Sequence, residues 1–138
     1  MSRKPPPKVE LTIPIIHDME LAATKTAEVV AKRMGLDEMK TAEINMALIE
    51  ACINAFEHSK SDSNVYIHYI IEDDTLIIKV GDRGVGFDAE VVEIPNIDDK
   101  IHSDHKRGWG LQLMKELMDT VEFETTDSGT TVTMTKSK

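Results

Sequence analysis

The stretch Met46–His58 reads M-A-L-I-E-A-C-I-N-A-F-E-H, and the rest of the chain is best interpreted around it. From Met46 to Phe56 it is apolar except at Glu50 and Asn54. On a helix, residues four apart stand one turn apart on the same face. A carboxylate in such a run cannot simply be buried unpaired, because a charge away from water costs several kcal/mol or more. The two polar side chains therefore face solvent, or they line a cleft that needs an acid and an amide.

Composition and charge indicate a single soluble domain. The chain has 138 residues, of which 41% are hydrophobic and 30% are charged, a balance typical of a globular protein. The formal net charge of −9 argues against nucleic acid as a main partner, because phosphate neutralisation needs clustered Lys and Arg. The single cysteine, Cys52, excludes an intramolecular disulfide and a cysteine-based zinc site. No apolar run has the roughly 18 residues of a membrane span or marks a signal region, so we expect a cytoplasmic protein without membrane contact.

The first half of the chain alternates between two kinds of pattern. Residues 1–7, with three consecutive prolines, predict a disordered tail, and residues 8–138 predict one domain. Alternating polar and apolar residues predict a strand over residues 8–14, which could lie at a sheet edge. Helical spacing predicts a helix over residues 18–34 that ends at Gly35. Asp37 is a plausible N-cap for a second helix that runs to about residue 58.

The second half predicts two hairpins on either side of a loop and a third helix. Residues 65–72 and 75–80 are β-branched runs joined by a two-residue turn. Residues 89–106 lack a clear period and predict a loop or lid. A helix should follow residue 107, and residues 121–125 and 130–136 predict a closing hairpin. The order β-α-α-β-β-lid-α-β-β indicates an α+β two-layer sandwich with helices covering one face of a sheet.

Two glycine-containing segments have the composition of a nucleotide site. Asp82 follows a strand and precedes Gly84 and Gly86, so its carboxylate could accept a hydrogen bond from an amine such as that of adenine; an ordinary glycine-rich turn is the alternative. In R-G-W-G at residues 107–110, glycines directly before a helix leave backbone N–H groups free to hold phosphate, and Arg107 adds a cation. The alternative here is a loop-to-helix junction with a solvated arginine. Neither segment is a Rossmann fingerprint or a P-loop.

Glu50 and Asn54 supply groups that phosphate chemistry still requires. The amide oxygen of Asn54 could bind Mg²⁺, which takes oxygen ligands and often only one or two from protein. The carboxylate of Glu50 could then orient or deprotonate a hydroxyl nucleophile. A polar notch in a core helix is the alternative. His58 lies one turn beyond Asn54 and could reach the same cleft or simply end the helix, and Thr130 belongs to a hairpin turn that could support the pocket.

These segments together resemble the four sequence boxes of the GHKL (Bergerat-fold) ATPases, in order. The boxes are E-x-x-x-N on a helix, D-x-G-x-G-F after a strand, R-G-x-G-L opening a helix and G-T-T before a strand. The short chain, the N-A-x-x-H ending of the first box and the compact lid are similar to the anti-sigma factor serine/threonine-protein kinases, or switch kinases, of bacteria. The resemblance covers about residues 11–136 and implies a sandwich of helices on a mixed, mostly antiparallel sheet.

The resemblance also implies roles for individual residues and partners for the whole chain. It implies Glu50 as general base, Asn54 as Mg²⁺ ligand, Asp82 as adenine receptor, and Arg107 near the γ-phosphate. It implies a homodimer that uses ATP and Mg²⁺, phosphorylates a serine or threonine of a STAS-domain anti-sigma antagonist, and binds a sigma factor. The resemblance implies Glu50 and Arg107 as the catalytic residues. The residues that it implies at the nucleotide, with Arg107 in both roles, are Asn54, His58, Asp82, Gly84, Gly86, Arg107, Gly108, Trp109, Gly110, Leu111 and Thr130.

Two other functions remain open from the sequence. The chain could be a non-catalytic, ATP-gated binding module, or a switch kinase of a signalling assembly that does not bind a sigma factor. A plain structural protein would require four separate coincidences of motif and order.

Overall fold

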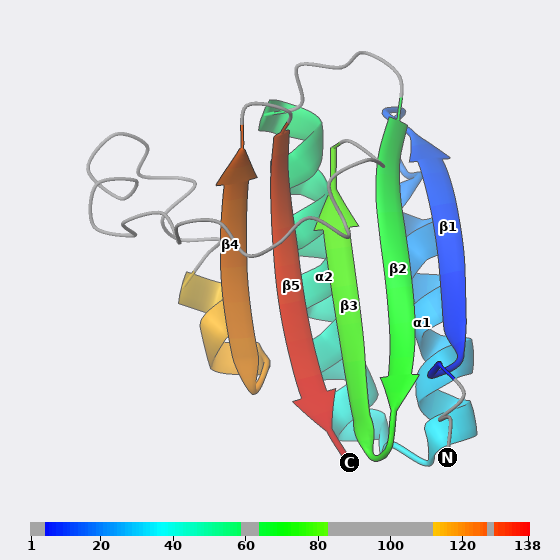
Figure 1. Cartoon of the computed structure of the whole chain (residues 1–138). Coiled ribbons are helices and arrows are strands. Elements are labelled where there is room, and N and C mark those ends of the chain that lie inside the picture. Colours follow the sequence, from blue (N-terminus) through cyan, green and yellow to red (C-terminus); the bar gives the residue numbers. More distant parts are fainter. Residues whose placement is uncertain (1–4, 59–63, 83–111, 127–128) are drawn as a thin grey trace.

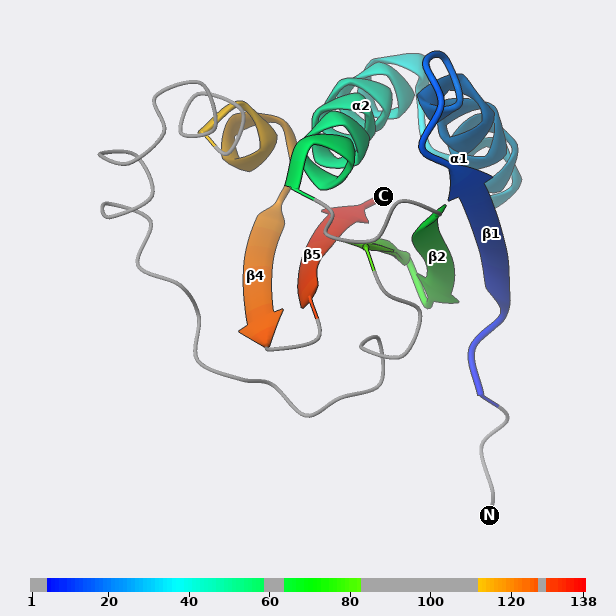
Figure 2. The same ribbon diagram turned by 90° about the horizontal axis from the view of Figure 1, so that it is seen from above.

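The computed structural model describes residues 5–58, 64–82, 112–126 and 129–138, with the backbone alone at residues 58, 125, 126 and 129. Five strands form one sheet, and the described helices pack on one of its faces (Figure 1, Figure 2). A short helical segment at residues 112–117 precedes the last hairpin. No helix in these ranges is long and apolar enough to cross a membrane. The elements in chain order are β1 (Lys8–Pro14), α1 (Glu20–Met34), α2 (Glu38–His58), β2 (Asn64–Glu72), β3 (Thr75–Gly81), β4 (Thr120–Thr126) and β5 (Gly129–Ser137).

The sheet has the strand order β1-β2-β3-β5-β4 and confirms the predicted α+β two-layer sandwich. β1 lies at an edge, and β5 inserts between β3 and β4. The expectation was a mixed, mostly antiparallel sheet, but all pairings between the described strands are antiparallel. The physical reason is that β2–β3 and β4–β5 are hairpins, while β1 and β5 run opposite to the strands beside them.

The bounds of α1 and α2 follow from specific backbone and capping groups. The residue Asp18 has a positive φ of 77°, so α1 begins at Glu20 and not at residue 18. The left-handed Gly35, with φ 84°, ends α1, and the N–H of Leu36 donates to the carbonyl of Ala31, as in a Schellman motif. The carboxylate of Asp37 accepts the Lys40 N–H at 2.8 Å, which confirms the predicted N-cap of α2.

The core lies between the two helices and one face of the sheet. Ile44, Leu48 and Cys52 of α2 are completely buried, and so are alternate residues of β2 and β3. Tyr69 of β2 is also buried, and its hydroxyl donates to the carbonyl of Ala23 in α1 at 2.7 Å. This bond fastens α1 to the sheet, because a buried hydroxyl without a partner would be costly.

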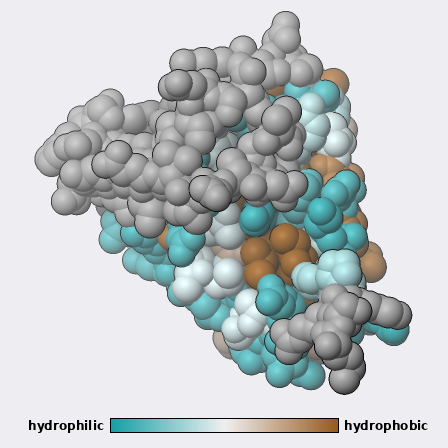
Figure 3. All heavy atoms as spheres, in the orientation of Figure 1, coloured by the Kyte–Doolittle hydropathy of each residue, from teal (hydrophilic) through white to brown (hydrophobic). Residues whose placement is uncertain are grey.

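The other face of the sheet has no described helix over it. Its side chains alternate with the buried ones, and they include Ile70 of β2 and Ile77 of β3, which are paired across the two strands and half-buried. Figure 3 shows apolar atoms gathered near the middle of this face, with polar atoms around them. The helical layer, not this face, carries the first predicted box.

Candidate nucleotide and catalytic site

The central helix α2 presents Glu50 and Asn54 as the sequence predicts. Both side chains are half-buried, and they lie one helical turn apart. Within the described residues, neither side chain has a hydrogen-bond or salt-bridge partner. Their carboxylate and amide oxygens are therefore available to a ligand, while partial exposure lets water solvate them in its absence.

The carboxylate of Asp82 is almost completely buried at the end of β3. It is 6% exposed, and its Oδ1 accepts a hydrogen bond from the backbone N–H of Thr130 at 3.1 Å. The N–H of Asp82 donates in turn to the Thr130 carbonyl at 3.4 Å. The second oxygen, Oδ2, has no hydrogen-bond partner among the described residues. A buried carboxylate with one free oxygen is suited to accept a hydrogen bond from an amine of a ligand.

The three described boxes meet at one end of the molecule. α2 packs over β3 and β5. Figure 1 shows the C-terminal end of α2, the end of β3 and the start of β5 at the same end of the sheet. The pair Asp82–Thr130 joins two of these elements directly, and Glu50 and Asn54 lie on the third. The fold therefore brings together boxes that are separated by up to 80 residues in the sequence.

The third box and the glycines of the second lie outside the described residues. The backbone of His58 ends α2, and its side chain is not described. The predicted lid, residues 89–106, also falls outside the description. The predicted site residues to which the same applies are Gly84, Gly86, Arg107, Gly108, Trp109, Gly110 and Leu111.

The described residues fit the ligands that the sequence predicts. Glu50 and Asn54 offer carboxylate and amide oxygens, which are the hard donors that Mg²⁺ prefers beside phosphate and water. Asp82 offers an acceptor for an amine, such as that of adenine. The bond between Asp82 and Thr130 was not expected, since Thr130 was assigned only a supporting role, and it uses the threonine backbone, for which the sequence contains no signal.

Cys52 lies on the same helix but takes no part in this chemistry. Its side chain is completely buried within the apolar run of α2. Burial, and secondarily the negative charge of Glu20, raise the pKa of the Cys52 thiol to about 12. The thiolate is therefore scarce at neutral pH, and Cys52 is a core residue and not a nucleophile.

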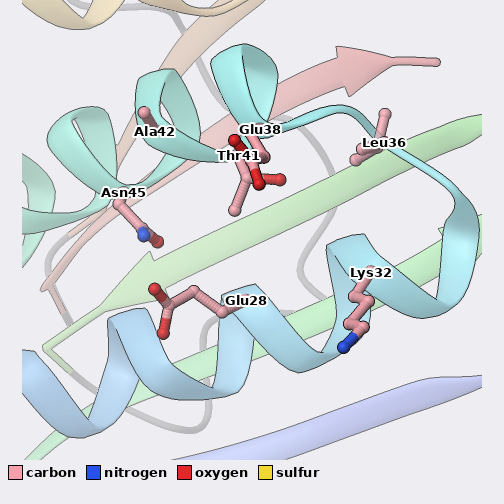
Figure 4. Close-up of a pocket in the computed structure, with 7 residues that line it drawn as sticks. All are labelled: Glu28, Lys32, Leu36, Glu38, Thr41, Ala42 and Asn45. Atoms are coloured by element: carbon pink, nitrogen blue, oxygen red, sulfur yellow. The ribbon is translucent and has the colours of Figure 1, made fainter.

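A separate groove of about 440 Å³ opens between α1 and α2 (Figure 4). Figure 4 shows the side chains of Asn45 and Glu28 pointing toward one another across it. With roughly 100° of rotation per residue, Asn45 lies about 140° around α2 from Glu50 and about 180° from Asn54, on nearly the opposite side of the helix. The groove is therefore distinct from the predicted site. Its lining residues are Glu28, Lys32, Leu36, Glu38, Thr41, Ala42 and Asn45.

Comparisons with known proteins agree with this arrangement. The family model described as "Histidine kinase-like ATPase domain" matches residues 17–136. Serine-protein kinase RsbW of Bacillus pumilus is 32% identical over 137 residues, which cover 93% of this chain and 84% of the relative. Serine-protein kinase RsbW of Bacillus licheniformis is 34% identical over 115 residues, which cover 78% of this chain and 71% of the relative.

A solved structure shares the fold. The crystal structure of the RsbU and RsbW domains of Rv1364c from Mycobacterium tuberculosis superposes with a TM-score of 0.70 at 21% identity. The match covers 98% of this chain and 33% of that longer chain. The family match over most of the chain, together with relatives above 30% identity along most of their own length, settles the assignment. The chain belongs to the histidine kinase-like ATPase family and, within it, to the RsbW-like serine-protein kinases.

Proposed function

We propose that this chain is a cytoplasmic, ATP- and Mg²⁺-dependent serine/threonine protein kinase and anti-sigma factor. Its substrate is a STAS-domain anti-sigma antagonist, and it exchanges that partner for a sigma factor. The proposal is supported by family membership, by relatives named serine-protein kinases, and by the four boxes in the sequence. A homodimer is part of the proposal, and light scattering of the purified protein tests it.

The observation that carries the proposal is the meeting of three boxes at one end of the sheet. The Asp82 carboxylate is almost completely buried, one of its oxygens accepts a backbone N–H, and the other has no hydrogen-bond partner among the described residues. At the same end, α2 presents a carboxylate and an amide without described partners. An adenine amine would complete the hydrogen bonding of Asp82, a Mg²⁺ ion on the phosphates would bind Asn54, and the acceptor hydroxyl would bind Glu50.

The residues divide the work of phosphoryl transfer between them. Asp82 orients the base of the nucleotide, and the amide oxygen of Asn54 would hold Mg²⁺. The ion would supply positive charge at the phosphate oxygens as charge builds during transfer. Glu50 orients the acceptor hydroxyl and takes its proton. Arg107 and the N–H groups of Gly108 and Gly110 are proposed to hold the phosphates, on the strength of the sequence motif.

The direct test is transfer of labelled phosphate from ATP to a purified STAS-domain partner. The expected result is ATP- and Mg²⁺-dependent labelling of a serine or threonine in the partner. A stable complex with no labelled product would replace the kinase with an ATP-gated binding module. Co-purification from native cells in ATP and in ADP tests the sigma factor separately. A kinase that labels its partner but captures no sigma factor would belong to a different signalling assembly.

A further inference from the structure

A lysine occupies a position of β5 where the strand pattern calls for a core residue. Val132, Met134 and Lys136 alternate along β5 and point to its helix-covered face. Val132 and Met134 belong to the hydrophobic core, and Lys136 is only 7% exposed. Its burial therefore requires compensating partners.

Lys136 has two such partners, from two different helices. Its Nζ lies 3.2 Å from the Oε1 of Glu43 in α2. The same Nζ donates a hydrogen bond to the backbone carbonyl of Leu117. Leu117 is the last residue of the helical segment 112–117, and a cation is favourable at the negative end of a helix. The side chain thus joins β5, α2 and that segment at one point.

The segment 112–117 is anchored from its C-terminal end. Met114 and Met118 are buried in the core, at 0% and 4% exposure, so the segment lies on the same face of the sheet as α2 (Figure 2). At 1.5 Å per residue, its six residues span only about 9 Å. The chain immediately before it is R-G-W-G at residues 107–110, the predicted phosphate-binding box. An anchor at Leu117 is therefore close in sequence to that box.

Glu43 connects the same anchor to Glu50 and Asn54. Residues 43, 50 and 54 are seven and four positions apart, so they lie along one face of α2. Glu43 and Glu50 are two turns apart, about 10 Å along the axis. The ammonium group of Lys136 therefore contacts both α2, which carries Glu50 and Asn54, and the helical segment 112–117, which follows the phosphate-binding box in the sequence.

We infer that Lys136 is a positioning residue of the nucleotide site. It fixes the segment 112–117, which follows the phosphate-binding box in the sequence, against α2, the helix that carries Glu50 and Asn54. This inference rests on the proposed function, and it concerns a residue outside the four boxes. Lys136 touches neither the nucleotide nor the acceptor, and it acts through Leu117 and Glu43.

The first test compares Lys136→Met with Lys40→Met. Lys40 is the matched control, because its Nζ donates to the Ser137 carbonyl at 3.1 Å and so also links α2 to β5. This link lies at the surface, and Lys40 makes no described hydrogen bond to residues 112–117. Calorimetry with Mg²⁺ and ADP should show about tenfold weaker binding for Lys136→Met, in line with the cost of small misplacements in a site. Lys40→Met should stay within about twofold of the unchanged protein, as expected of a surface contact.

A double variant separates positioning from plain stabilisation. Lys136→Met leaves Glu43 without its partner, whereas Lys136→Met with Glu43→Met removes both charges, a change that proteins often tolerate. The midpoint of thermal unfolding should therefore recover in the double variant. Nucleotide affinity should stay low, because the Leu117 carbonyl still lacks its donor. Affinity that recovers together with the unfolding midpoint would overturn the inference.

Hydrogen exchange provides a readout that does not depend on nucleotide. In the ligand-free protein, amides of residues 112–117 should exchange faster in Lys136→Met and in the double variant, and at the normal rate in Lys40→Met. Unchanged exchange in the first two variants would overturn the inference. Failure of the protein without substitutions to bind ADP would instead overturn the proposed function. The exchange experiment would still decide whether Lys136 anchors the segment.

Discussion

At the end of the sheet where α2 begins, polar groups are paired with partners from the chain itself, whereas at the opposite end several are not. The first end contains the Asp37 cap, the bond from Lys40 to the Ser137 carbonyl, and the ion pair between the buried Lys136 and the half-buried Glu43. At the other end, Glu50 and Asn54 have no partner among the described residues, and Asp82 uses one of its two oxygens.

The difference separates groups that stabilise the fold from groups that await a ligand. A polar group paired within the chain contributes modest stability, while one without a partner from the chain leaves its hydrogen-bonding capacity open to a ligand. Natural proteins leave polar groups in this state mainly at functional sites. Substitutions at the paired end should therefore change the free energy of unfolding, and those at the other end should change binding and transfer. Lys136 is the exception at the paired end, because its contacts with Leu117 and Glu43 connect it to the nucleotide site.

The largest effect is expected for Glu50→Ala. Loss of a general base should lower the rate of phosphotransfer by about 10²–10⁴-fold. Affinity for ADP should change little, because Glu50 is assigned to the acceptor hydroxyl. A transfer assay and calorimetry measure the two quantities, and Glu28→Gln, in the separate groove, is the control. Near-normal transfer by Glu50→Ala would show that the base is another residue.

Asp82→Asn should weaken ADP binding without a large loss of stability. A hydrogen bond to a charged group contributes about 1.5–3 kcal/mol, or roughly 10–150-fold in affinity. The asparagine oxygen can still accept the Thr130 N–H, so the unfolding midpoint should hold. Inosine diphosphate lacks the exocyclic amine and should bind the unchanged protein weakly. Equal affinity of the unchanged protein for ADP and inosine diphosphate would contradict the assignment of Asp82.

Cys52→Ala, in the buried core of α2, should alter how the free energy of unfolding depends on pH. Burial raises the pKa of the thiol from 9.0 to about 12, so the folded state keeps a proton that the unfolded chain releases above pH 9. This contribution to stability is complete below pH 9 and is lost as pH rises toward 12, at about 1.4 kcal/mol per pH unit.

Urea unfolding at pH 7 and pH 10 measures this change. From pH 7 to pH 10, the unchanged protein should lose about 1.4 kcal/mol of unfolding free energy relative to Cys52→Ala. Tyr69 contributes nearly equally in both proteins, because burial is the largest cause of its raised pKa and the charge of Cys52 is only the second. A constant difference would mean that the thiol titrates normally in the folded state.

Asp37→Ala should have the smallest effect, and only on stability. Loss of an N-cap costs about 1 kcal/mol, because the Lys40 N–H loses its acceptor. Asp37→Ser is the control, since a serine hydroxyl can cap in the same way. Chemical denaturation gives the free energies, and ADP affinity should not change in either variant. A large fall in ADP affinity would show that the cap of α2 supports the nucleotide site as well as the helix.

Much of the fold could be predicted because local signals and burial agree. The alternation in residues 8–14 gave β1 with its observed bounds, and Gly35 and Asp37 mark the end of α1 and the start of α2 through their own backbone and side-chain chemistry. The start of α1 was placed two residues early, because the positive φ of Asp18 depends on the turn after β1 and not on helical spacing.

The candidate site was predictable in its residue types but not in its connections. Glu50 and Asn54 stand out as polar positions in an apolar run, so a pattern could find them. The bond from Thr130 to Asp82 involves a backbone N–H, which every threonine possesses. The burial of Lys136 depends on Glu43 and Leu117, which are far from it in sequence and become its neighbours only once the layers pack.

The position of β5 also constrains the order in which this protein folds. β5 follows all other strands in sequence, yet it lies in the interior of the sheet, between β3 and β4. Residues paired between β3 and β5, such as Thr75 and Ser137, are 62 positions apart, and pairings so distant in sequence form slowly. During synthesis, β3 therefore keeps an open edge until β5 has left the ribosome. Aggregation through that edge is a hazard of the nascent chain, and the sheet is complete only when the strand that carries Thr130 and Lys136 has been inserted.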